Sequence, residues 1–234
     1  MSWTIPKIWE GGDVWILGGG PSVAKQFDIP KVVVQNVISG TYPLSAYSKY
    51  MAPIHDKHVI GINVAYLIGD WLDMCFFGDV DFFLKRSEEL AAWPGLKITC
   101  SDTAGKQPWL KFIEKDREHI RGISTRPDRV SWNLNSGTCA ISIAAWTGAK
   151  RIFLLGFDMN LGEDKRQHFH NAYERAPVTD EEKLRKWMGT FDRHLRGFEF
   201  IAEDAKKLGI EIINVSPTSE IREFKKVSLN EALQ

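Results

Sequence analysis

Near its beginning the chain reads Asp13-Val14-Trp15-Ile16-Leu17-Gly18-Gly19-Gly20-Pro21-Ser22, an apolar run followed by three glycines, a proline and a serine. This order is typical of a strand that turns into a helix beside a phosphate, because glycines allow a ligand to come close and permit positive φ. Pro21 suits the first helical position, and Ser22 adds a hydroxyl beside first-turn N–H groups that attract anions. We therefore expect a nucleotide phosphate to bind Gly18, Gly19, Gly20, Pro21 and Ser22; the alternative is an ordinary strand-to-helix turn.

Apolar runs of strand length recur along the chain, and helical stretches separate several of them. The clearest helical stretch, residues 136–147, ends at Gly148, and another, residues 198–208, ends at Gly209. The alternation predicts an α/β fold, a Rossmann-like parallel sheet with helices on both faces. With 234 residues, we expect a single domain over residues 1–234. The expected strands are residues 14–17, 32–34, 59–62, 74–77, 97–99, 152–155 and 210–215.

Two segments interrupt this alternation. Residues 36–57, which contain two prolines and several aromatic side chains, are expected to form an insertion over the edge of the sheet. Residues 160–197 are highly charged and follow the end of an expected strand. Since functional loops gather at the carboxyl ends of strands, we expect a lid-like insertion at about 160–197; a pair of solvated helices is the alternative.

The composition narrows the class of protein. Lys and Arg total 30 and Asp and Glu total 30, a balance that argues against a protein built mainly for nucleic-acid binding. The three cysteines, Cys75, Cys100 and Cys139, are widely spaced, which predicts buried free thiols rather than a disulfide framework or a zinc site. With no leader pattern and no apolar run near 18 residues, we expect a soluble, cytoplasmic protein. The many aromatic residues can line a pocket or a homo-oligomer face.

Polar residues follow several of the expected strands. Asn63, Asp79 and Asp158 each come directly after an apolar run, and Ser136-Gly137 opens the helix at 136–147. In a parallel sheet these positions share one edge with the glycine turn. Asn63 is then suited to a ribose or base edge, and Ser136 with Gly137 to a second anion or a sugar. The alternatives are a turn residue and a helix N-cap.

Carboxylates at a phosphate site can bind Mg²⁺. Asp79, Asp81 and Asp158 are the candidates, and the alternative is that Asp79 starts a turn and Asp81 caps the next helix.

Three histidines lie within the charged segment: His168, His170 and His194. A histidine that is neutral near pH 7 suits a general base, so these are the candidate catalytic residues. His168 and His170 can also form a metal pair, although no third ligand is evident, and exposed histidines without a role are the alternative.

The order of motifs resembles one known family. Residues 18–22, Gly61-Ile62-Asn63, residues 135–144, residues 148–158 and residues 213–219 are similar to the bacterial sialyltransferases of the Campylobacter lipooligosaccharide type. The same frame is similar to the archaeal-type 6-hydroxymethylpterin diphosphokinases and to phage and bacterial proteins of unknown role. The resemblance covers most of the chain and implies a Rossmann-like domain with a lid.

The resemblance also implies roles for single residues. In the sialyltransferases the glycine turn and the following Asn hold the CMP part of CMP-sialic acid, which points to Gly18, Gly20, Ser22 and Asn63. The Ser-Pro-Thr-Ser ending suggests nucleotide contacts from Ser216 and Thr218. A lid histidine acts as the base there, and His194 is nearest in order. The diphosphokinase-like relatives point instead to His168 or His170. Gly19 stands where the sialyltransferase turn has Asn, and Tyr173 is the candidate for a lid tyrosine.

Together these features predict a transferase that uses a nucleotide-activated small-molecule donor. The first expectation is a sialyltransferase-like glycosyltransferase that uses a CMP-sugar, has a lid histidine as general base and requires no cofactor. The alternatives are a diphosphotransferase that uses a nucleoside triphosphate with Mg²⁺, and a non-catalytic protein that binds a nucleotide or sugar on the same fold.

Overall fold

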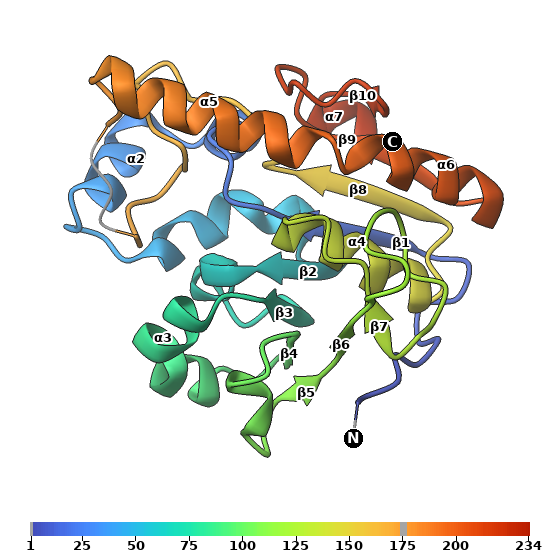
Figure 1. The fold of residues 1–234 in the computed structure, drawn as a ribbon. Coiled ribbons are helices and arrows are strands. Elements are labelled where there is room, and N and C mark those ends of the chain that lie inside the picture. Colours follow the sequence, from blue (N-terminus) through green and yellow to red (C-terminus); the bar gives the residue numbers. More distant parts are fainter. Residues whose placement is uncertain (1, 174–176) are drawn as a thin grey trace.

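The computed structural model describes residues 2–173 and 177–234; residues 174–176 of the expected lid lie outside the described part. The main sheet consists of β1 (Asp13–Leu17), β2 (His58–Ile62), β3 (Met74–Phe77), β4 (Leu96–Thr99), β5 (Lys111–Phe112), β8 (Arg151–Leu155), β9 (Glu211–Asn214) and β10 (Lys225–Lys226). Its strand order is β10-β9-β8-β1-β2-β3-β4-β5, and each neighbouring pair is parallel (Figure 1). A second, two-stranded sheet pairs β6 (Glu114–Lys115) with β7 (Arg129–Val130).

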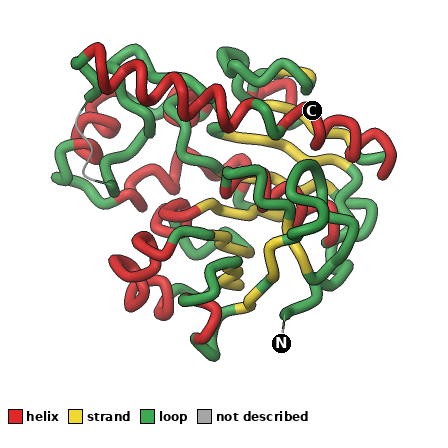
Figure 2. Tube along the Cα trace, in the orientation of Figure 1, coloured by secondary structure: helices red, strands yellow, loops and turns green. Residues whose placement is uncertain are grey.

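Helices and loops lie on both sides of this sheet, as Figure 2 shows. The predicted α/β fold, a Rossmann-like parallel sheet covered on both faces, is therefore confirmed. The α-helices are α1 (Ser22–Gln26), α2 (Lys31–Ile38), α3 (Val80–Ala92), α4 (Ser136–Trp146), α5 (Glu181–Leu195), α6 (Phe198–Leu208) and α7 (Leu229–Ala232). The 3₁₀ segments are η1 (Leu44–Ile54), η2 (Asn63–Ile68) and η3 (Ala104–Lys106).

Strand β1 lies at the point where the order in which the chain adds strands to the sheet reverses. Leu17, its last residue, pairs with Gly61 of β2 on one side and with Leu155 of β8 on the other, so the three carboxyl ends are level. The chain builds the sheet outward from β1 through β5 and then returns to place β8 on the opposite side of β1. Ligands of open α/β sheets bind outside such a switch point, so a ligand is expected at the loops after β1 and β8.

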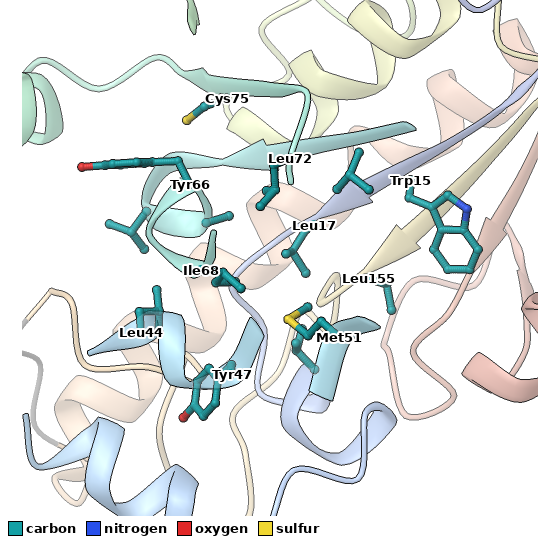
Figure 3. Packing of buried hydrophobic residues seen from close by; sticks show 14 of the residues in the cluster. Trp15, Leu17, Leu44, Tyr47, Met51, Tyr66, Ile68, Leu72, Cys75 and Leu155 are labelled. Carbon is teal, nitrogen blue, oxygen red and sulfur yellow. The ribbon is translucent and has the colours of Figure 1, made fainter. Parts of the chain in front are cut away.

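Alternate side chains of β1 pack in two separate hydrophobic clusters. Trp15 and Leu17 belong to a cluster with Tyr47 and Met51 of η1 (Figure 3), whereas Ile16 packs in the core that contains α4 and α6. Both faces of the strand are therefore buried, which explains why it reads as a continuous apolar run instead of an alternating one.

Two local predictions are wrong. Residues 32–34 form part of helix α2 and not a strand, since Pro30 takes the N-cap and the valines recur at helical spacing. Residues 36–57 do not lie over the sheet edge, because η1 buries Tyr47 and Met51 completely against the central strands. The helix predicted at 198–208 is confirmed, and it ends at Gly209 with a left-handed φ of 66°.

The prediction for the cysteines is confirmed, because Cys75, Cys100 and Cys139 are all buried and free. Among the described helices, none has the length and apolar character needed to cross a membrane.

Candidate functional site

A cavity of about 1180 Å³ opens at the carboxyl ends of the parallel strands. Its wall is formed by the loops after β1, β2, β3 and β8, by the first turns of α3 and α4, and by part of α5. The sequence-based expectation that these loops share one edge therefore holds. The predicted site residues that line the cavity are Gly18, Gly19, Gly20, Asn63, Asp79, Asp81, Ser136, Gly137, Asp158, His168 and His194.

The glycine turn is packed tightly against the loop after β8. The Gly18 N–H donates to the carbonyl of Leu155 at 2.8 Å, and the Gly20 N–H donates to the carbonyl of Gly156 at 2.9 Å. A Cβ atom on Gly18 would lie 2.8 Å from the Gly156 oxygen, and one on Gly20 would lie 2.6 Å from it. Backbone packing between neighbouring loops therefore requires glycine at Gly18, and the same packing together with the Asp158 side chain requires it at Gly20.

The N-terminus of α1 already holds an anionic group from the protein itself. The Ser22 N–H donates to Oδ2 of Asp158 at 3.1 Å, and Pro21 takes the N-cap. Asp158 therefore occupies the place at which the glycine pattern predicts a phosphate. The Ser22 N–H is thus engaged by a carboxylate, and the binding of a phosphate at this turn stays a prediction.

Asp158 is 1% exposed, and its Oδ1 atom has no hydrogen-bond partner among the described residues. Burial raises the pKa of Asp158, whereas hydrogen bonds from Ser22 and Ser216 oppose that rise. The hydroxyls of Ser22 and Ser216 are themselves 3.0 Å apart. Ser216 is buried and is not part of the described cavity wall. Thr218 is exposed, and its carbonyl accepts from Nδ2 of Asn160 at 2.8 Å. Contact of Ser216 and Thr218 with a nucleotide stays a prediction.

The other polar residues at this edge act largely as helix caps. Asp79 accepts from the Asp81 N–H at 2.9 Å and caps α3, so Asp79 is the cap instead of Asp81. Asn135 accepts from the Gly137 N–H at 2.8 Å and caps α4. In the described residues, no group of three or more His, Cys, Asp or Glu side chains is placed to hold a metal ion.

Asn63 differs from these caps, because it adopts a left-handed φ of 53° and its Oδ1 atom is buried without a partner in the described part of the chain.

His168 contacts the backbone of the glycine turn. Its Nδ1 atom lies 3.1 Å from the Gly19 carbonyl oxygen, which also accepts from the Phe169 N–H at 3.3 Å. Because a carbonyl only accepts hydrogen bonds, Nδ1 of His168 carries a proton. The His168 and His170 rings are stacked, with centroids 5.1 Å apart and planes 2° from parallel.

His170 and His194 have different environments. His170 is buried outside the described wall of the large cavity, and its Nδ1 accepts from the Ala172 N–H at 3.2 Å. His194 lies on α5 in the cavity wall, one turn after Phe191. Burial lowers the pKa of His194, and the positive charge of Arg193 lowers it further. His194 is therefore mostly neutral near pH 7.

Several residues of the wall were not predicted, and most are aromatic, apolar or basic. Arg86 of α3 donates to the Ala172 carbonyl at 2.9 Å and so connects α3 to the segment after β8. Phe191 could have been found from its i, i+3 spacing to His194. Other wall residues carry no sequence signal for this cavity; among them are Val80, Phe82, Lys85, Trp132, Leu134, Met159, Asn160, Gln167 and Ala172.

No protein-family model and no curated protein matches the chain. The chain is similar to solved structures of glycosyltransferases. The glycosyltransferase MAf from Magnetospirillum magneticum AMB-1 shares 12% identity with a TM-score of 0.52, over 97% of this chain and 36% of that chain. The sialyltransferase CstII from Campylobacter jejuni, in complex with CMP-3FNeuAc, shares 16% identity with a TM-score of 0.46, over 93% of this chain and 86% of that chain. At such identities the likeness concerns the fold alone.

Proposed function

We propose that this chain is a glycosyltransferase that uses a nucleotide-activated sugar, with His194 as the general base. The observation that carries the proposal is the cavity of about 1180 Å³ at the switch point, with a histidine of lowered pKa in its wall. Typical small-molecule pockets have volumes of about 300–1,000 Å³, so there is room for a donor and an acceptor together. The resemblance of the sequence motifs to the sialyltransferases makes a CMP-sugar the first donor to test.

In this proposal the neutral imidazole of His194 takes the proton from an acceptor hydroxyl. The acceptor oxygen then bonds to the anomeric carbon of the donor sugar, and the bond from that carbon to the phosphate oxygen breaks. General-base help of this kind contributes about 10²–10⁴-fold. His170 is a poorer candidate, because its Nδ1 lone pair is already engaged by the Ala172 N–H.

We place the donor phosphate at the first turn of α4. Asp158 occupies the N-terminus of α1, and the first turn of α3 carries Asp79 and Asp81, which repel a phosphate. The cap of α4, by contrast, is the neutral Asn135, and Ser136 lies in the cavity wall. Helix N-termini favour anions, so α4 is the most suitable of the three. The glycine turn and Asn63 then contact the nucleoside.

The segment 160–197 acts as the lid in this proposal, because His168 connects it to the glycine turn and Arg86 connects it to α3. A covered site excludes water, which protects an activated sugar from hydrolysis. The transfer itself needs no cofactor.

Binding is tested by thermal unfolding against CMP, CDP, UMP, UDP, GDP, ADP and ATP, each with and without Mg²⁺. A ligand at about 100 times its Kd stabilises the native state by about 2.7 kcal/mol, which raises the melting temperature. The proposal predicts a selective rise with a nucleoside mono- or diphosphate that does not require Mg²⁺. A rise only with a triphosphate and Mg²⁺ would instead support diphosphate transfer. Selective binding without turnover over a panel of nucleotide sugars would support a non-catalytic binding protein.

A further inference from the structure

The cavity wall contains two large apolar residues in a backbone conformation that such residues rarely adopt. Six described non-glycine residues have a positive φ: Asp28, Asn63, Asn133, Leu134, Met159 and Lys165. Leu134, with φ of 58°, and Met159, with φ of 55°, are the apolar members, and both line the cavity. The left-handed region brings Cβ of an L-residue close to its own backbone, so it is seldom used without a compensating reason.

Leu134 is held in this conformation from both sides. Asn133 accepts from the Gly122 N–H at 2.9 Å, and its Nδ2 donates to the carbonyls of Gly122 at 3.0 Å and Ser131 at 3.2 Å. Asn135, on the other side, is fixed as the cap of α4. The Leu134 side chain is nevertheless 53% exposed, so packing within the protein does not account for its position.

Met159 is fixed in a similar way by its neighbours. The Asp158 carbonyl accepts from the Glu220 N–H at 2.9 Å, and Asn160 donates to the Thr218 carbonyl at 2.8 Å. The loop of residues 216–220 thus anchors the residue on each side of Met159. Strain that the surroundings enforce in this manner is concentrated at functional sites.

Both residues lie on loops that reach the first turn of α4. Leu134 directly precedes Asn135, the cap of α4. Met159 follows Phe157, whose ring would lie 2.6 Å from a Cβ on Gly137 in the first turn of α4. Both loops therefore meet the helix end at which we place the donor phosphate.

We propose that Leu134 and Met159 are specificity-determining residues that pack on the flat apolar face of a substrate ring. Leu134 is exposed and Met159 partly buried, and both line a cavity whose wall also contains aromatic side chains, among them Trp132. Ring faces are the apolar surfaces of nucleotides and aryl glycosides, and an apolar wall suits them. The inference rests on the proposed function, because the first candidate for the ring is the nucleobase of the proposed nucleotide donor. An aromatic group on the acceptor is the second source of the same chemistry.

The test measures binding by calorimetry in Leu134→Asn and Met159→Asn, because Asn tolerates the left-handed conformation and replaces the apolar surface with a polar one. The probes are CMP, UMP and AMP for the base and phenyl β-galactoside for an aryl acceptor. Asp28→Gly is the matched control, since Asp28 has φ of 48° and lies outside the described cavity wall. We expect at least a tenfold loss of affinity for a ring-bearing probe in both Asn variants, and wild-type affinity in the control.

Leu134→Gly separates the role in binding from a role in folding. We expect its melting temperature to equal or exceed that of the wild type, because glycine relieves the left-handed strain, while its affinity falls. Wild-type affinity of the Asn variants for every probe would overturn the inference, as would a wild-type protein that binds no ring-bearing probe. The wild type can also bind phenyl β-galactoside but no nucleotide, with that binding lost in the variants. This result would support the ring contact of Leu134 and Met159 and contradict the proposed nucleotide donor.

Discussion

Nδ1 of His168 lies 3.1 Å from the carbonyl oxygen of Gly19, so a histidine from the charged segment is attached to the backbone of the glycine turn. A Cβ atom on Gly19 would lie 2.8 Å from the same nitrogen. The middle glycine of the turn therefore leaves room for a protein side chain as well as for any ligand. The contact also connects two segments that are far apart in the sequence but share one cavity wall.

We predict that Gly19→Ala destabilises the protein, because the added methyl group displaces His168 from its hydrogen bond. Overpacking of this kind costs about 1–3 kcal/mol. The measurement is denaturant unfolding, with Gly189→Ala as the control. Gly189 lies within α5, where a new Cβ would contact nothing within 4 Å. That substitution should stabilise the chain by about 0.5–1 kcal/mol, as alanine does in helices. Equal stability of Gly19→Ala and the wild type would contradict the contact.

Asp158 makes the stability of the protein depend on pH in a defined direction. Its pKa in the folded state is raised by burial, so the folded protein binds a proton more readily than the unfolded chain does. Stability from this group is thus lost as pH rises from the ordinary value of 3.8 through the raised pKa, and the loss is complete above it. Asp158→Asn removes the titration.

The measurement for Asp158 is the free energy of unfolding of both proteins between pH 4 and pH 8. We expect the wild type to gain stability relative to Asp158→Asn as the pH is lowered. A constant difference across this range would show that Asp158 does not titrate as its burial implies. Asp180→Asn serves as the control, because Asp180 is an exposed cap of α5 whose pKa is lowered by its hydrogen bonds.

Arg86 provides a test of the attachment between α3 and the segment after β8. Arg86→Ala removes the hydrogen bond to the Ala172 carbonyl, which at about 1 kcal/mol corresponds to a roughly fivefold increase in local opening. Limited proteolysis should therefore cut residues 160–173 several times faster, while global stability changes little. Lys85→Ala changes the neighbouring exposed cation and should leave the cleavage rate unchanged. Faster cleavage in both variants would point to a general loss of charge instead.

The central strands could be predicted from the sequence because burial on both faces leaves an uninterrupted apolar run, as in Val14 to Leu17. The meeting of Asn63, Asp79 and Asp158 at one edge followed from parallel topology alone. Residues 32–34 were predicted as a strand because three consecutive valines favour one. Pro30 at the N-cap and the packing of Val33, Val34 and Val37 on the core instead favour a helix.

Other parts of the site depend on contacts that no local pattern encodes. The pairing of Asp158 with Ser22 arises because β8 returns to lie beside β1, and strand order cannot be read from either strand. Leu134 and Met159 line the cavity and have a left-handed φ, which local preference predicts for glycine or asparagine but not for these residues. The proposal for these two residues therefore depends on the backbone of the folded chain.

The proposed role of His194 as general base is tested most directly by kcat/KM for glycosyl transfer in His194→Ala, with Arg193→Ala as the neighbouring control on α5. We expect kcat/KM to fall by about 10²–10⁴-fold in His194→Ala. We expect near wild-type activity in Arg193→Ala, with the acid limb of its pH profile moved to higher pH, because the charge of Arg193 helps to lower the pKa of His194. Full transfer activity in His194→Ala would show that His194 is not the base.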